Sequence, residues 1–144
     1  MSTKLDRQFL AWSSGISSEI EFWDRWMQEK GGPWPEDYKS RVEGSYEFPG
    51  RLAALVPHVP PAQLAALDVG SGPLPYIGRT LNGQAINLTC VDPLAPFYKE
   101  LGTKHGLNIT VEQAFVEDLT AAFDIESFDL VHMQNALDHS FDPV

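Results

Sequence analysis

Two acidic residues and a pair of glycines carry the clearest chemistry in this sequence. Asp68 closes an apolar run and is followed by Gly70 and Gly72 with Ser71 between them, and Asp92 closes the next apolar run. Glycines let a ligand approach the backbone because no Cβ stands in the way, and carboxylates attract cations and accept hydrogen bonds from hydroxyl groups. The spacing predicts a site for a small ligand that carries positive charge and hydroxyl groups.

The glycine turn must be compared with the phosphate-binding turn of dinucleotide enzymes. That turn reads G-x-G-x-x-G, but the third glycine position here is Pro75, and Pro73 and Pro75 both lack a backbone N–H donor. S-adenosylmethionine needs no such donors, because its ammonium and sulfonium groups are cationic. We therefore expect S-adenosylmethionine as the cofactor, with Asp68 beside its cationic end and Asp92 on the ribose hydroxyls. A nucleotide-dependent oxidoreductase is the weaker alternative.

The elements that position this turn are predicted to alternate between strands and helices. Apolar or alternating runs predict strands over residues 65–69, 86–91, 108–112 and 128–133, and the intervals 76–81, 94–105 and 117–123 are long enough for covering helices. Such βαβ units predict an α/β fold, an open parallel sheet of about four strands with helices on both faces. Ligands of these sheets bind at the carboxyl ends of the strands, where Asp68 and Asp92 lie.

The residues before the sheet are predicted to be helical. A first helix runs through Trp12 and is expected to end at Gly15, and Ser18 is expected to cap a second helix that ends at residues 31–32. A further helix is expected to start at Pro35. We therefore divide the chain into two parts, a helical N-terminal segment over residues 1–61 on the substrate side and a cofactor-binding half-domain over residues 62–144.

Four tryptophans in the N-terminal segment have two possible roles. They are Trp12, Trp23, Trp26 and Trp34. Such side chains can form the wall of a ligand pocket, but more often they are the apolar face by which a helix packs on the next layer. Both roles stay open from the sequence alone.

The charge of the chain limits its partners. It carries 10 Lys and Arg residues against 20 Asp and Glu residues, a formal net charge of −10. This charge repels phosphate backbones and no basic run offers an exception, so a nucleic-acid partner is not expected. No segment has the apolar length of a membrane span, and the first twelve residues lack the pattern of a secretory signal. We expect a cytoplasmic protein without a membrane partner.

Cysteine and histidine give little support to metal or hydrolytic chemistry. Cys90 is the single cysteine and lies in an apolar run, so it is expected to be a small buried hydrophobic residue. The four histidines lack the helical spacing of metal ligands, and no serine lies in a G-x-S-x-G turn. No metal site is expected.

Four motifs in order resemble those of class I S-adenosylmethionine-dependent methyltransferases. They are LDVGSGP, VDP, VEDL and FDLVHMQNALDHSFDP. The last is similar to the L-x-H-x-x-D-P run of small-molecule methyltransferases. The resemblance implies a Rossmann-like fold whose complete sheet has seven strands, and it implies a small-molecule methyl acceptor.

The resemblance also assigns site residues by position. It implies that Asp68, Gly70 and Gly72 surround the methionine moiety, that Asp92 holds the ribose, and that Val116 and Glu117 lie beside the adenine. The set is completed by Ser71, Pro93, and Gln134 and Asn135 at the methyl-transfer end. Phe115 stands where many relatives carry an acid, so adenine recognition is expected to depend on stacking and backbone contacts.

His139 is the expected general base if the methyl acceptor is a hydroxyl. It follows the fourth strand toward the predicted pocket, and the reference pKa of histidine lies near 6.5. The alternative is a histidine bonded to backbone or packed on the rim. Methyl transfer itself needs no acid for the leaving sulfur, so positioning is expected to carry most of the rate.

The resemblance covers only the first four strands of the family's sheet. We therefore expect a C-terminally truncated chain with weak or no activity alone, whose fourth strand is an apolar sheet edge open to self-association. The alternative function is a non-catalytic cofactor-binding or interaction module derived from a methyltransferase. Neither the acceptor nor the methylated atom follows from the sequence.

Overall fold

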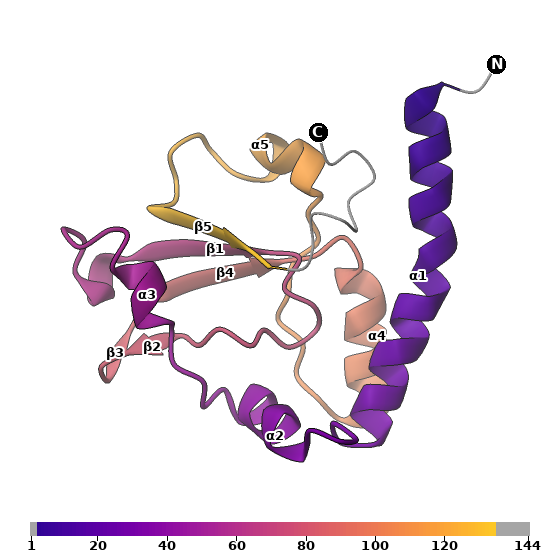
Figure 1. The fold of residues 1–144 in the computed structure, drawn as a ribbon, viewed down its shortest axis with the longest axis horizontal. Coiled ribbons are helices and arrows are strands. Elements are labelled where there is room, and N and C mark those ends of the chain that lie inside the picture. Colours follow the sequence, from indigo (N-terminus) through magenta and orange to yellow (C-terminus); the bar gives the residue numbers. More distant parts are fainter. Residues whose placement is uncertain (1–2, 135–144) are drawn as a thin grey trace.

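The computed structural model describes residues 3–134 of the chain. It is an α/β structure with a three-stranded parallel sheet, a two-stranded antiparallel sheet and helices, beginning with a long N-terminal helix (Figure 1). Within the described residues, no helix combines the length and apolar character that a membrane crossing requires.

The parallel sheet contains β1 (Ala65–Val69), β4 (Asn87–Val91) and β5 (Leu130–Met133), in the order β4-β1-β5. The central strand β1 is almost wholly buried, as its continuous apolar sequence predicts for a strand covered on both faces. These three strands confirm the sequence prediction. The third predicted strand in chain order, over residues 108–112, is wrong, because the structure has only an isolated parallel bridge from Val91 to Glu112 there.

The N-terminal helix α1 (Lys4–Gln28) is one continuous helix of 25 residues. The predicted break at Gly15 is wrong, and so is the predicted cap at Ser18. The helix instead begins at Thr3, whose hydroxyl accepts from the Asp6 N–H while the Asp6 carboxylate accepts from the Thr3 N–H. Glycine within a helix costs about 1 kcal/mol, and packing of the apolar face of α1 on the rest of the protein outweighs it.

The remaining helices are shorter. The predicted helices at residue 35 and over residues 94–105 are confirmed as α2 (Pro35–Glu43) and α4 (Ala95–His105), each ending at a glycine in the left-handed conformation. A turn of helix, α3 (Gly50–Ala53), follows α2. The helix predicted over residues 117–123 is a short 3₁₀ turn followed by α5 (Leu119–Ala122).

Residues 76–81 do not form the predicted helix. The segment leads into a small hairpin of β2 (Thr80–Leu81) and β3 (Gln84–Ala85). The backbone N–H of Gly78 donates to the Glu47 carbonyl and that of Phe48 donates to the Thr80 carbonyl, so two loops run side by side. At Gly78 the two backbones are so close that a Cβ would overlap the Tyr46 carbonyl oxygen. Residues 76–81 therefore pair with the neighbouring loop and do not form a helix.

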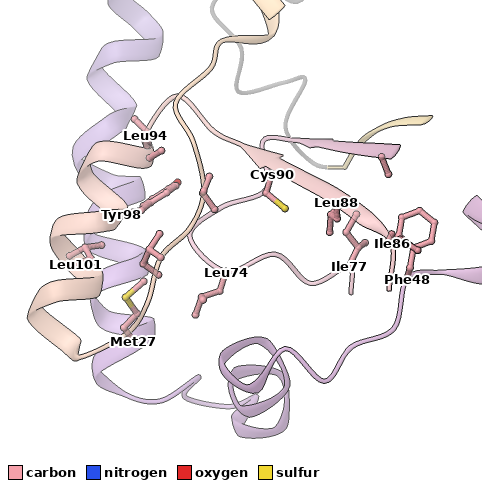
Figure 2. Packing of buried hydrophobic residues seen from close by; sticks show 14 of the residues in the cluster. Met27, Phe48, Leu74, Ile77, Ile86, Leu88, Cys90, Leu94, Tyr98 and Leu101 are labelled. Atoms are coloured by element: carbon pink, nitrogen blue, oxygen red, sulfur yellow. The ribbon is translucent and has the colours of Figure 1, made fainter. Parts of the chain in front are cut away.

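Side chains cover both faces of the parallel sheet. On one face, a single apolar cluster contains Met27 of α1, Tyr98 of α4, Leu74 from the loop after β1, and Leu88 and Cys90 of β4 (Figure 2). Cys90 is buried and unpaired, as predicted, and burial raises the pKa of its thiol to about 12. A smaller cluster covers the other face, where the packing residues are Leu67, Val69, Val91, Ala114, Leu119, Phe123 and Phe128.

Candidate functional site

A cavity of about 810 Å³ opens at the carboxyl ends of β1, β4 and β5. Figure 1 shows that the arrows of all three strands point toward α1, and one face of α1 forms the opposite wall of the cavity. The cavity collects nearly all predicted site residues, namely Asp68, Gly70, Ser71, Gly72, Asp92, Pro93, Val116, Glu117 and Gln134. Asn135 and His139 lie outside the described residues. Phe115, predicted to offer stacking, also lines the cavity.

The glycine turn lies between β1 and α1. Gly70 and Gly72 both have φ of 69°, a left-handed conformation that favours glycine, and the N–H groups of Gly70 and Ser71 both donate to the Val91 carbonyl. A Cβ on Gly72 would lie 3.1 Å from Cζ2 of Trp23. Two features therefore require a glycine at Gly72: its backbone conformation and the close approach of α1.

Asp92 holds the glycine turn by its backbone. One carboxylate oxygen accepts the N–H of Gly72 at 3.0 Å, and the other accepts the N–H of Leu94 at 2.9 Å. The side chain is buried, and this burial raises the pKa of Asp92 to about 6, against the two hydrogen bonds that lower it. The sequence predicted a ligand contact for this carboxylate but not its hydrogen bonds to the backbone. The bond to Leu94 could have been expected, because the side chain of an aspartate at a turn often accepts a hydrogen bond from the backbone N–H two residues later.

Asp68 has a side-chain partner. Its Oδ1 lies 2.8 Å from Nδ1 of His132, which occupies the paired position on β5. Burial raises the pKa of Asp68, and the neighbouring His132 and Arg41 oppose that rise. The sequence analysis did not select His132, because 64 residues separate it from Asp68 and only the register of β1 and β5 brings them together.

Aromatic side chains of α1 form the wall opposite the strands. Trp12 and Trp23 line the cavity, and the Trp12 ring lies 6.0 Å from that of Phe115. The Trp23 indole N–H donates to Glu19, another lining residue, at 2.8 Å. Trp12 and Trp23 therefore have the predicted role of a pocket wall, and Trp26 has the predicted role of a core residue. Trp34 is 66% exposed and has neither role.

The charges around the cavity are mainly acidic. Among the described lining residues, the carboxylates are Glu19, Asp68, Asp92 and Glu117, and the only lysine or arginine is Arg41. Arg41 is already engaged by Asp37 and by the Leu74 carbonyl, and its guanidinium lies 5.7 Å from the Tyr76 ring. A cavity with this balance attracts cationic ligands and repels polyphosphates.

No family model, curated protein or solved structure matches this chain. The chemistry of the cavity therefore has to be judged from its own residues. Over residues 3–134, no group of three His, Cys, Asp or Glu side chains is arranged to hold a metal ion. The described site offers carboxylates, aromatic faces and an open glycine backbone, which together suit a cationic ligand with a flat ring.

Proposed function

We propose that the cavity binds S-adenosylmethionine and that the chain is the cofactor-binding part of a methyltransferase for a small-molecule acceptor. One observation carries the proposal. Asp68 and Asp92, on neighbouring strands, face a single acidic cavity on either side of a turn made by Gly70 and Gly72. Two carboxylates so placed complement the cationic sulfonium end and the hydroxyl-bearing ribose of one molecule.

The order of the strands supports this assignment. After β1 the chain goes to β4 on one side, and it returns to β5 on the other side of β1. In open α/β sheets of the Rossmann-like kind, ligands bind in the crevice at such a switch in strand order. We therefore propose that the sheet is Rossmann-like and that the cofactor lies across the carboxyl end of β1.

The lining residues give the cofactor a direction in the cavity. Asp92 and Pro93 follow β4 on one side of β1, and the ring of Phe115 lies near that of Trp12. These groups would hold the nucleoside, with the adenine stacked on an aromatic face. The β5 side carries His132 and the amide of Gln134, to which the Tyr76 hydroxyl donates. The sulfonium and the methyl acceptor belong at that side.

Asp92 has two functions in this proposal, since it holds the glycine turn and also binds the ribose. Each of its oxygens accepts one backbone N–H, and an ionised carboxylate offers further lone pairs to the ribose diol. Hydroxyl donors would favour the ionised form of Asp92 and so oppose the rise that burial produces in its pKa. Ribose binding is thus expected to release a proton near pH 6.

Calorimetric titration with S-adenosylmethionine, S-adenosylhomocysteine and NAD tests the proposal. We expect the two sulfur nucleosides to bind and NAD to fail, because the cavity is acidic and Pro73 and Pro75 lack N–H donors. Binding of NAD alone would support the oxidoreductase alternative. Formation of S-adenosylhomocysteine with a panel of small hydroxyl, amine and carbon acceptors then separates a working methyltransferase from a cofactor-binding module.

A further inference from the structure

The Asp68–His132 pair is a buried polar side-chain contact in the cavity. The two residues are directly paired across β1 and β5, so the backbone fixes their separation. Nδ1 of His132 lies 2.8 Å from Oδ1 of Asp68, and the side chains are 10% and 7% exposed. A contact that is buried and held by two neighbouring strands keeps its geometry while ligands enter and leave.

The second ring nitrogen of His132 is available to a ligand. His132 lines the cavity, and within residues 3–134 its Nε2 has no hydrogen-bond partner. An ionised Asp68 accepts a proton-bearing Nδ1–H, which leaves the lone pair on Nε2. A carboxylate that fixes the tautomer of an imidazole in this way prepares the other nitrogen to take a proton.

We propose that His132 is the proton acceptor for the attacking group of the methyl acceptor and that Asp68 positions it. This inference rests on the proposed methyltransferase function. As the nucleophile X forms its bond to the methyl carbon, the carbon–sulfur bond breaks and its electron pair stays on sulfur. The proton of X–H passes to Nε2 of His132. The products are methylated X, neutral S-adenosylhomocysteine and an imidazolium that the Asp68 carboxylate stabilises.

The place of His132 in the sheet fits this role. β5 and β4 flank β1 on opposite sides, so His132 lies away from the nucleoside side, where Asp92 follows β4. Gln134, which also lines the cavity, follows β5 directly. We therefore assign to His132, which lines the cavity, the role of general base that the sequence had suggested for His139.

Two opposing effects act on Asp68. Burial raises its pKa above the usual value, and His132 and the Arg41 cation of α2 oppose that rise. On the other flank, Cys90 of β4 keeps its proton, because burial raises its pKa to about 12. The other titratable groups that line the cavity are Glu19, Tyr76, Asp92, Tyr98 and Glu117.

Cofactor binding and proton acceptance require the same form of the pair. Protonated His132 would neutralise Asp68 and leave less negative charge for the sulfonium, whereas neutral His132 leaves the carboxylate charge in place. Binding of S-adenosylmethionine should therefore favour the neutral imidazole of His132. S-adenosylhomocysteine, whose thioether is uncharged, should favour it less.

Nitrogen NMR of the full chain with labelled histidine tests the inference without any acceptor. The His132 signals are assigned from their loss in His132→Gln, with His58→Gln at an exposed position as the matched control. At pH 8 with S-adenosylmethionine bound, we expect a proton on Nδ1 and none on Nε2. At a mildly acidic pH we also expect a smaller fraction of imidazolium at His132 in this complex than in the S-adenosylhomocysteine complex. An Nε2–H tautomer, or equal imidazolium fractions in the two complexes, would overturn the inference.

Affinity and turnover supply the second readout. The wild-type preference for S-adenosylmethionine over S-adenosylhomocysteine should weaken as pH falls, because both ligands share the ribose contact with Asp92 and only one carries the sulfonium. His132→Gln should remove this pH dependence of the preference, since glutamine can donate to Asp68 but takes no proton. An unchanged pH dependence in His132→Gln contradicts the inference but leaves cofactor binding intact. Failure of the cofactor to bind at any pH instead defeats the proposed function, and this inference with it.

With a hydroxyl acceptor found in the panel, His132→Gln should lower kcat by about 10²–10⁴-fold and change KM little. The same loss in His139→Gln, with His132→Gln unaffected, would return the base to His139 and refute the inference.

Discussion

Asp68 and Asp92, the two cavity carboxylates at strand ends, are alike in sequence and different in structure. Asp92 bonds two backbone N–H groups and fixes the path of the turn at Gly72, whereas Asp68 bonds the side chain of His132. A carboxylate tied to backbone is needed for the shape of the site. A carboxylate tied to an imidazole can change its charge with a proton or a ligand. The carboxylate on the β4 side of the cavity therefore fixes the shape of the site. The carboxylate on the β5 side can change its charge when a proton or a ligand binds.

Removal of the Asp92 carboxylate should have the largest effect. Asp92→Ala leaves the buried N–H groups of Gly72 and Leu94 without their acceptor, at a cost of about 1–3 kcal/mol each. We expect a clear drop in the midpoint of chemical unfolding and loss of cofactor binding. The matched control Glu100→Gln, on the exposed face of α4, should leave both unchanged. Wild-type stability in Asp92→Ala would mean that the carboxylate does not hold the turn.

The pH dependence of stability should reveal the protonation of Asp92. Burial raises the pKa of Asp92 to about 6, above the usual aspartate value of 3.8, so the native state binds this proton more tightly than the unfolded state. The contribution of Asp92 to stability should therefore rise as pH falls from about 6 toward 3.8 and stay level below it. Denaturation at several pH values measures the difference between wild type and Asp92→Asn. A difference that does not vary with pH would contradict the assignment.

Substitution of the second glycine should affect the turn and α1 together. Gly72→Ala forces an alanine into a left-handed conformation, with its Cβ 3.1 Å from the Trp23 ring. A cost of about 1–2 kcal/mol is expected in the free energy of unfolding. Gly83→Ala is a useful control, because Gly83 also has a positive φ but nothing lies within 4 Å of its Cβ. Equal losses would assign the whole effect to the backbone and none to α1.

Neutralisation of Asp68 should act on binding more than on folding. Asp68→Asn keeps a hydrogen-bond acceptor near His132 and removes a buried charge, so a small change in stability of either sign is expected. Affinity for S-adenosylmethionine should fall by about tenfold, and affinity for the uncharged S-adenosylhomocysteine by less. Calorimetric titration of both ligands gives the comparison. Equal losses for the two ligands would remove the sulfonium from the vicinity of Asp68.

The smallest effect is expected on the α1 wall, which faces the strand ends. Gly15 lines the cavity in the middle of α1, and nothing lies within 4 Å of a Cβ there. Gly15→Ala should stabilise the protein by up to about 1 kcal/mol and leave binding intact. Gly15→Phe should keep the fold and reduce cofactor affinity, because its ring projects from the cavity wall. Binding by Gly15→Phe at wild-type strength would show that the ligand does not reach α1.

The elements set by local sequence were predictable. The continuous apolar runs predicted β1 and β4, and the interval between strands over residues 94–105 predicted α4. The errors arose where distant contacts decide. Gly15 stays helical because α1 packs along its length, and residues 76–81 follow the neighbouring loop rather than form a helix. Local pattern carries no information about such pairings.

The candidate site was predictable in composition but not in its contacts. The glycine turn and both acids could be selected from the sequence because strand ends converge at one edge of a parallel sheet. The partner of each acid could not, since His132 depends on strand register and the N–H of Gly72 depends on how the turn folds back. The sequence left open whether the tryptophans of α1 form a pocket wall, because that depends on the packing of two distant segments.

The structure of the complex with S-adenosylmethionine tests the central claim most directly. We predict that the ligand occupies the cavity, with its ribose at Asp92, its sulfonium on the Asp68 side of β1, and its methyl group directed toward His132. Density for the nucleoside outside this cavity, or a ligand bound with its sulfonium at the β4 side, would contradict the account.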